Sequence, residues 1–455
     1  MNEGRLSNWR LLLYAGPAVP IAALGVPISV FLPQFYAGEM GLGLATVGTI
    51  FLICRLWDVV TDPVMGFLSD KYPSRWGRRR HWIALSVPIL MLSAYMVFLP
   101  SKPVTPYYLA GWMIFLYIGW TMLTISHMSW GAELDRDYNE RSRIQGFREG
   151  AQIAGVPIVL VLVALVQIYL STPDTVDADR VNSIGWFVIV MLPIAVFFAV
   201  TITPERNIKL PGVLSVKQML EPLLRNAPLR RVTAADFASG VSGASLGSLF
   251  VYIVEYDWRL KEYIPLLLLL YFTAGVLFVP VVVRLARALG KHRAAVASGT
   301  FNACLVPLVF LIPDGNIWIA GGMLFFLGVN AGAMNLLYRS IMADIGDLDE
   351  IETGERRTGL FYSLLTLTQK TGAAIAVGVV FWLLALVGFD PQGDNPPEVV
   401  NRLSYIFVGI PMLANASVAF LMWGFPIDEK KQKEMRKILE ERYLEEVESA
   451  QRPIP

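Results

Sequence analysis

Long apolar runs separated by short polar segments recur along almost the whole chain. A helix needs about 20 apolar residues to cross a hydrocarbon core about 30 Å thick. Runs near that length lie at residues 11–35, 44–69, 82–100, 106–130, 149–170, 184–203, 232–256, 263–286, 294–313, 316–341, 358–388 and 402–425. Because unpaired backbone groups are not tolerated in lipid, each run is predicted to be a helix. The pattern therefore predicts an all-α polytopic membrane protein with twelve transmembrane helices.

Lysine and arginine residues are divided unevenly between alternate loops. With the N-terminus in the cytoplasm, 31 of the 38 fall on that side, five fall on the other side, and Arg55 and Lys370 lie within spans. Such an excess predicts that both termini are cytoplasmic. The short loops are typical of a bacterial inner (plasma) membrane protein. The charged tail that follows the last span is predicted to be a solvated cytoplasmic helix.

Composition excludes several classes of function. Only 16% of the residues are charged and 55% are hydrophobic, whereas soluble domains carry about a quarter charged residues. The formal net charge of +1 offers no basic surface for nucleic acid. Cys54 and Cys304 lie in apolar runs without a CxxC partner, so neither a disulfide framework nor a zinc site is predicted. We expect no resident cofactor.

An internal repeat becomes visible when the two halves of the chain are offset by 213 residues. The segment Gly77-Arg-Arg-Arg80 then falls on Gly290-Lys-His-Arg293, and Arg143 falls on Arg356. The offset indicates duplication of a six-helix unit, although basic loop residues also match by chance. The predicted domains are an N-terminal bundle at 1–203, a cytoplasmic linker at 204–231, a C-terminal bundle at 232–425 and a cytoplasmic tail at 426–455. Transporters built from repeats bind solute near the midplane and alternate access by rocking the repeats.

Two carboxylates lie inside the second span. Asp58 and Asp62 are four residues apart and therefore share one helix face, and Thr61 offers a hydroxyl beside them. Ionisable groups within a span usually mark an ion or solute path. Two such carboxylates can share a proton or chelate a hard cation such as sodium. The alternatives are that Asp58 only neutralises Arg55 or Lys370, and that Asp62 serves the backbone break before the next proline.

Further candidates lie in other spans. Lys370 lies mid-span among small residues and needs a carboxylate partner. Arg148 can clamp a polar solute with its planar donor fork, or anchor to lipid phosphate. His127 can relay protons or remain neutral and hydrogen-bonded. Trp130, and less strongly Trp120, offers a stacking surface for a sugar, although tryptophan also belongs to interfacial belts. Asp236, in the seventh span, is the candidate from the second half.

The motifs resemble one family of transporters. The segment 55–66 (RLWDVVTDPVMG), followed by Asp70 and RWGRRR at 75–80, is similar to the glycoside-pentoside-hexuronide:cation symporters, the melibiose-permease branch of the major facilitator superfamily. A second match runs from 343 to 362 and ends at Lys370. The resemblance covers nearly the whole chain. It implies two six-helix bundles, cytoplasmic termini, and solute symport with sodium, lithium or protons.

The resemblance also implies roles for individual residues. Asp58 and Asp62 correspond to the paired cation-site carboxylates, and Lys370 to the lysine beside them. Arg148 corresponds to the fifth-helix arginine near solute, and Trp130 to the fourth-helix tryptophan beside the sugar. We therefore place the coupling cation at Asp58, Asp62, Thr61 and Lys370, with sodium as one candidate ion at the two carboxylates.

Two departures from the family pattern change the expected solute and ion. Ser126 stands where the melibiose carriers have a further carboxylate, and Ala22 where they have a sugar-binding aspartate. We keep Ser126 among the substrate-binding candidates with His127, Trp130, Arg148 and Lys370. With one fewer anionic ligand, a proton is favoured over sodium. The apolar first span also leaves room for an amphiphile such as a lysolipid.

The predicted function is cation-coupled symport of a sugar, glycoside or related organic solute by alternating access. The alternatives are an amphiphile carrier, an uncoupled facilitator and, least favoured, a membrane sensor or enzyme, because the sequence offers no persuasive catalytic set. The loop from Asp70 to Arg80 is either a positive-inside anchor or a cytoplasmic gate formed by Asp70, Arg78, Arg79 and Asp344. The expected partners are one organic solute, one monovalent cation and the lipid bilayer, with a monomer as the functional unit.

Overall fold

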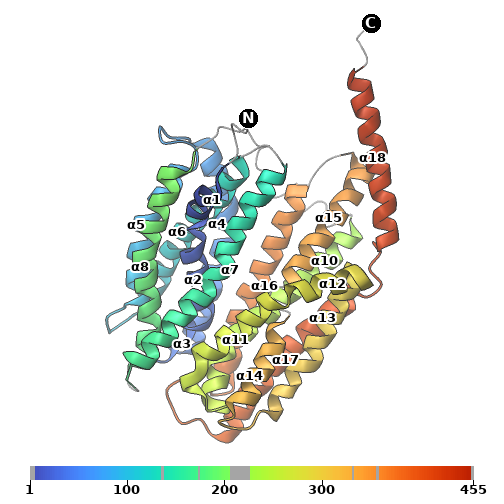
Figure 1. Cartoon of the computed structure of the whole chain (residues 1–455). Helices are drawn as coiled ribbons and strands as arrows, with labels where there is room; N and C mark the ends of the chain where they lie inside the picture. Colours follow the sequence, from blue (N-terminus) through green and yellow to red (C-terminus); the bar gives the residue numbers. More distant parts are fainter. Residues whose placement is uncertain are drawn as a thin grey trace.

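A computed structural model describes residues 6–134, 138–172, 175–204, 226–329, 333–354 and 358–451. These residues form helices and contain no strand, apart from an isolated bridge between Ser74 and Gly77. The helices form an elongated bundle with α18 (Glu429–Gln451) projecting from one end (Figure 1). We call this end, where α1 also begins, the terminal face, and the other end the distal face. The chain is an all-α polytopic membrane protein.

The first half of the chain supplies the helices α1 (Asn8–Ala15), α2 (Ala18–Val30), α3 (Leu32–Ala37), α4 (Leu44–Lys71), α5 (Arg80–Phe98), α6 (Pro106–Glu133), α7 (Tyr138–Tyr169) and α8 (Val176–Ile202). The first predicted span is thus three short helices. Its breaks follow the prolines, because a proline has no backbone N–H to continue the hydrogen-bond ladder. Pro17 precedes α2, and Pro33 lies in the first turn of α3.

The second half supplies α10 (Ala227–Tyr252), η1 (Ile253–Asp257), η2 (Lys261–Tyr263), α11 (Ile264–Leu277), α12 (Val279–Leu289), α13 (Lys291–Leu305), η3 (Val306–Leu311), α14 (Ile317–Gly328), α15 (Ala333–Thr353), α16 (Thr358–Leu386) and α17 (Pro397–Met422). Helix α10 begins before the predicted boundary at 232 because Asn226 caps it, accepting a hydrogen bond from the Leu229 amide at 2.9 Å. Most of the predicted linker, residues 205–225, lies outside the described residues.

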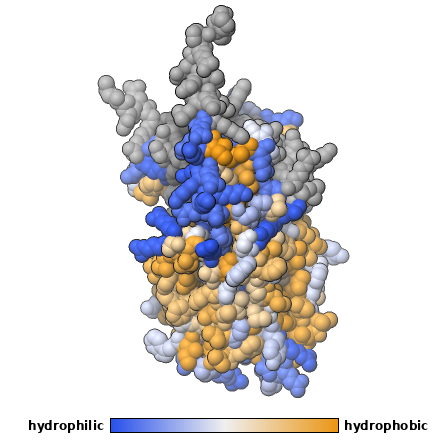
Figure 2. Space-filling model, turned by 90° about the vertical axis from the view of Figure 1, so that its right-hand side faces the viewer, coloured by the Kyte–Doolittle hydropathy of each residue, from blue (hydrophilic) through white to orange (hydrophobic). Residues whose placement is uncertain are grey.

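The number of spans differs from the predicted twelve. Among the described residues, ten helices are long and apolar enough to cross a membrane, or eleven if the pair 261–277 and 279–289, bent by 41°, counts as one span. The predicted span 316–341 is divided between α14, an apolar helix of 12 residues, and α15. Gly328 ends α14 in close contact with α11, where an added Cβ would lie 2.1 Å from the Tyr271 carbonyl oxygen. The surface seen in Figure 2 is mostly hydrophobic away from the terminal face.

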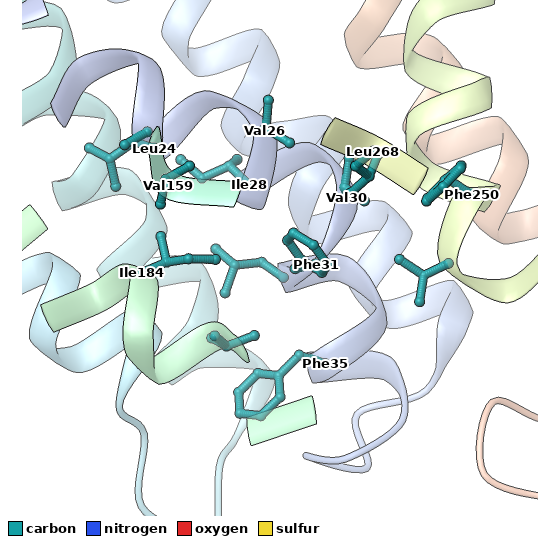
Figure 3. Close-up of a cluster of buried hydrophobic side chains, with 14 of the residues drawn as sticks. Leu24, Val26, Ile28, Val30, Phe31, Phe35, Val159, Ile184, Phe250 and Leu268 are labelled. Atoms are coloured by element: carbon teal, nitrogen blue, oxygen red, sulfur yellow. The ribbon is translucent and has the colours of Figure 1, made fainter. Parts of the chain in front are cut away.

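The two halves meet along α4 and α16. Glycines allow this close approach: a Cβ on Gly48 would lie 2.5 Å from the Phe381 Cβ, and one on Gly378 would lie 3.0 Å from Leu52. Toward the distal face, one apolar core runs through both halves, and Figure 3 shows Val30 beside Leu268 and Phe250. A second core cluster contains C-terminal-half and tail residues alone. The ribbons of the two halves diverge toward the terminal face (Figure 1).

Candidate functional site

The centre of the α4–α16 contact holds a charged cluster formed by Asp58, Asp62 and Lys370, which we call the triad. The Lys370 Nζ lies 2.8 Å from the Asp58 Oδ2 and 2.5 Å from the Asp62 Oδ2. The two aspartates project from consecutive turns of α4, and the lysine reaches them from the other half. Their side chains are largely shielded, with 8%, 19% and 31% of the surface exposed for Asp58, Asp62 and Lys370.

Thr121 of α6 completes the cluster, and sequence reasoning missed it. Its hydroxyl lies 3.0 Å from the Asp58 Oδ1 and 3.2 Å from the Asp62 Oδ1. Thr61, which was predicted to be the hydroxyl ligand, instead donates to the backbone carbonyl of Asp58 at 3.1 Å. The hydroxyl at the carboxylates therefore comes from a neighbouring helix, and Thr61 reaches only as far as the Thr121 hydroxyl, 3.4 Å away.

The alternatives for the two aspartates can be compared with these contacts. Arg55 donates to the Ser29 hydroxyl at 2.7 Å, so the described ion pair of Asp58 is with Lys370. Helix α4 continues through Pro63. The Asp62 carboxylate is bound by Lys370 and Thr121 and is not used to cap the backbone at this proline.

The charge of the triad determines what it can bind. Two carboxylates and one ammonium, all ionised, leave a net charge of −1 in the middle of a membrane-spanning bundle. Uncompensated charge is costly in this setting. One proton or one monovalent metal ion would neutralise it. The two inner carboxylate oxygens already share the Lys370 ammonium, so a sodium ion bridging them would require that ammonium to move, whereas a proton needs only one free oxygen.

Arg148 is buried in α7, with 6% of its surface exposed. Its guanidinium contacts Glu149 at 2.5 Å, Gln145 at 3.2 Å and Gln152 at 3.4 Å. Such burial does not fit the alternative of an anchor to lipid phosphate. It leaves Arg148 as a charge-paired donor that a solute would have to reach in competition with Glu149.

The fourth-span candidates Ser126, His127 and Trp130 point into the N-terminal half, and each is fully buried. Tyr14 packs edge-on against the Trp130 ring, with ring centroids 5.8 Å apart, and its hydroxyl donates to the His127 carbonyl at 2.9 Å. The His127 Nε2 lies 2.8 Å from the Tyr14 carbonyl and must carry the hydrogen, because a carbonyl can only accept. The described contacts thus place His127 and Trp130 in packing against Tyr14 of α1, and none of these contacts joins either residue to the triad.

Three of the four predicted gate residues, Arg78, Arg79 and Asp344, form ion pairs within their own halves. Arg79 contacts Glu133 at 2.6 Å, and Arg78 lies 3.9 Å from the same carboxylate. Asp344 pairs with Lys291 at 2.6 Å. The side chain of Asp70 lies outside the described part of the structure. Among the described contacts, Arg78 and Arg79 share Glu133 in the N-terminal half, and Asp344 pairs with Lys291 in the C-terminal half.

A polar network joins the halves at the distal face, and it was not predicted from the sequence, where its members are isolated charges. Lys261 pairs with Asp177 at 2.8 Å and with Glu255 at 2.6 Å. Arg180, 2% exposed, contacts Asp177 at 2.8 Å and the Lys261 carbonyl at 2.8 Å. Gln34 donates to Glu255 at 3.1 Å. These side chains line a cavity of about 430 Å³ and link α3 and α8 to η1 and η2.

The chain is similar to known transporters along most of its length. The profile of a family described as MFS/sugar transport protein matches residues 13–429. A glucuronide carrier protein homolog from Escherichia coli is 23% identical over 421 residues, covering 90% of each chain. A sodium-dependent lysophosphatidylcholine symporter from Gallus gallus is 22% identical over 478 residues, covering 96% of this chain and 90% of the other.

The fold is also found among solved structures. A bacterial homolog of the human lysosomal transporter Spinster, in an inward-facing and unoccupied conformation, superimposes with a TM-score of 0.67 at 11% identity. The match covers 96% of this chain and 98% of the other. At that identity the similarity concerns the fold alone, which is that of the major facilitator transporters.

Proposed function

The chain belongs to the MFS/sugar transport protein family, whose members are transporters and not enzymes, and we propose that it is a secondary active symporter. It carries a sugar, glycoside or related organic solute together with one monovalent cation. The observation that supports this most is the net charge of −1 on the triad where the two halves meet. A cation that cancels this charge lowers the cost of burying the triad when the halves reorient.

The contacts support a simple coupling cycle. The triad, the α4–α16 contact and the polar network hold the distal face together, while the described terminal-face ion pairs remain within single halves. In the proposed topology the terminal face is cytoplasmic, so the conformation is inward-facing. A cation that binds Asp58 or Asp62 releases the Lys370 ammonium, which then becomes available to the solute. The functional unit is a monomer in the plasma membrane.

A proton is the proposed coupling ion. The Lys370 ammonium lies between the oxygens that a sodium ion would use, and Thr121 is the single uncharged side-chain oxygen that contacts both carboxylates among the described residues. A sodium site of this kind would have few ligands compared with the six or so that hard cations such as Ca²⁺ and Mg²⁺ usually take.

An amphiphile is the second candidate solute. The relative from Gallus gallus is a lysophosphatidylcholine symporter by name, and the first span of this chain, α1 to α3, is apolar over α2. A charged headgroup would suit the triad and Arg148. Helix α2 is largely buried in this conformation, so an acyl chain would contact it only after the helices rearrange.

The test is solute accumulation in proteoliposomes under an imposed inward proton or sodium gradient, across a panel of glycosides, uronic acids and lysolipids. We expect one sugar-like solute to accumulate when the proton gradient is imposed. Accumulation of a lysolipid would move the assignment to the second candidate. Equilibration of a solute without dependence on either gradient would contradict symport and indicate a facilitator.

A further inference from the structure

A second buried carboxylate lies outside the triad. Asp236 projects from α10 in the C-terminal half and is 2% exposed. Its Oδ2 lies 2.9 Å from the Thr368 hydroxyl of α16. Among the residues that the structure describes, no lysine, arginine or histidine nitrogen forms an ion pair with it. The carboxylate is also within reach of the Gln369 backbone amide. A buried aspartate with two uncharged hydrogen-bond partners and no ion pair is unusual in a membrane span.

The hydrogen bonds of Thr368 indicate which form of Asp236 fits this site. The Thr368 hydroxyl also lies 3.0 Å from the carbonyl oxygens of Leu364 and Leu365. A hydroxyl has one hydrogen, and carbonyls only accept. If Asp236 is ionised, three acceptors compete for that hydrogen. If Asp236 is protonated, it donates to Thr368, which donates to a carbonyl, and each group is satisfied.

Close helix packing keeps water away from this carboxylate. A Cβ on Gly240 would lie 2.4 Å from the Gln369 carbonyl oxygen, and one on Gly372 would lie 2.3 Å from the Phe237 carbonyl oxygen. The backbones of α10 and α16 are therefore in direct contact just C-terminal to Asp236 on α10 and to Thr368 on α16. An ionised carboxylate there would lack both a counter-ion and hydration, which is costly.

The charged and titratable groups on the elements packed against α10 are as follows. Helix α15 carries Tyr338, which donates to the Ala235 carbonyl at 3.2 Å, and the exposed Arg339. Its acidic residues follow in later turns: Asp344, Asp347, Asp349, Glu350 and Glu352. Helix α16 offers Lys370, which is engaged by the triad. Helices α2 and α3 carry no charged residue, and α17 carries Glu398 and Arg402 at its first turns. The remaining groups are Glu255 and Asp257 of η1, which directly follows α10. They lie about 20 residues beyond Asp236 along the chain.

We propose that Asp236 is a second proton-binding site of this transporter, occupied by a proton in this conformation. Binding adds one proton from water to the carboxylate and yields a neutral acid, and release returns that proton to water. Thr368 and Lys370 are two residues apart, so at about 100° per residue they project from nearly opposite sides of α16. Helix α16 thus connects Asp236 to the triad, and movement of α16 when Lys370 is released would open the contact between Thr368 and Asp236. This role rests on the proposed symport, which it extends to the second half.

The experiment is infrared spectroscopy of the reconstituted full-length protein at pH 7, where exposed carboxyls with a pKa of about 4 are ionised. We expect a carbonyl band of a protonated carboxylic acid in the wild type, absent in Asp236→Asn and retained in the control Asp394→Asn, a change at an exposed loop residue.

A second variant keeps the test informative if Asp236→Asn does not fold. Thr368→Val removes the acceptor of the acid proton and should shift the frequency of the same band. If Asp236→Asn keeps the wild-type band, or if neither variant alters it, Asp236 is not protonated and the proposal is wrong. Failure of symport itself would be seen separately, in solute accumulation that does not depend on an ion gradient.

Discussion

Among single residues, the triad carries a net charge of −1, and binding one cation neutralises it. The triad also depends on a fourth residue, Thr121, whose hydroxyl reaches both carboxylates. Thr121 lies more than 50 positions from each triad residue in the sequence. Hydrogen bonds to charged groups are worth about 1.5–3 kcal/mol, so this contact contributes to the balance between the ionised and the neutralised pair.

Replacing Thr121 by valine distinguishes a proton-binding triad from a sodium-binding one. The ionised carboxylates lose a hydrogen-bond donor worth about 1.5–3 kcal/mol, and about 1.4 kcal/mol corresponds to a tenfold change in proton affinity. Proton-driven uptake should therefore extend to a pH about one unit or more higher. A sodium ion would instead lose a ligand and bind more weakly. Thr121→Ser should behave as wild type, and so should Thr61→Val, since Thr61 donates to a backbone carbonyl. Uptake measured against pH and sodium concentration checks this, and a larger effect at Thr61 than at Thr121 would contradict the assignment.

The sequence identified Asp58, Asp62 and Lys370 because ionisable residues in apolar runs are rare and conspicuous. It could not identify Thr121, since threonine is ordinary in a span and the contact joins α4 to α6 in space. It could not show that His127 and Trp130 pack against Tyr14, because α6 is apolar around its circumference and no polar stripe indicates which side of the helix faces which neighbour.

At the scale of elements, the distal network holds α8 against η1 and η2 through Lys261. The spans that flank this network were predicted from their apolar runs. The network itself could not be predicted, because charges near the ends of spans follow no periodic pattern. The same limit applies to the tenth span, where a continuous apolar run conceals the division between α14 and α15.

Lys261→Gln should move the conformational equilibrium toward the state that is open at the distal face. Of the two ion pairs lost, the one with Asp177 joins the two halves. An ion pair between partly exposed groups is worth about 0.2–1 kcal/mol, so we expect a shift of up to a few-fold. The matched control is Lys102→Gln, which breaks the 2.7 Å pair with Glu39 within the N-terminal half. Spin-label distances between the distal ends of α8 and α11 report the shift. Equal distance distributions in the Lys261→Gln variant and the control would rule out a latch role for the network.

At the scale of the whole molecule, the glycine-lined α4–α16 contact and the triad lie on the same pair of helices. The division into two halves followed from the repeat and the resemblance. Closure of the distal face, in contrast, is a property of one conformation, and the sequence alone does not indicate which conformation the chain adopts. Reorientation of the halves must separate α4 from α16 or slide them, and either movement changes the surroundings of Asp58, Asp62 and Lys370 together.

The most direct test of the account is solute-driven ion movement in proteoliposomes, measured beside solute exchange. The wild type should move about one cation with each solute. Asp58→Asn and Asp62→Asn each leave a triad that is neutral without a cation, so they should retain exchange and lose ion movement, whereas Asp394→Asn should behave as wild type. If either triad variant still carries the ion with the solute, the charge of the triad does not set the coupling and the central claim is wrong.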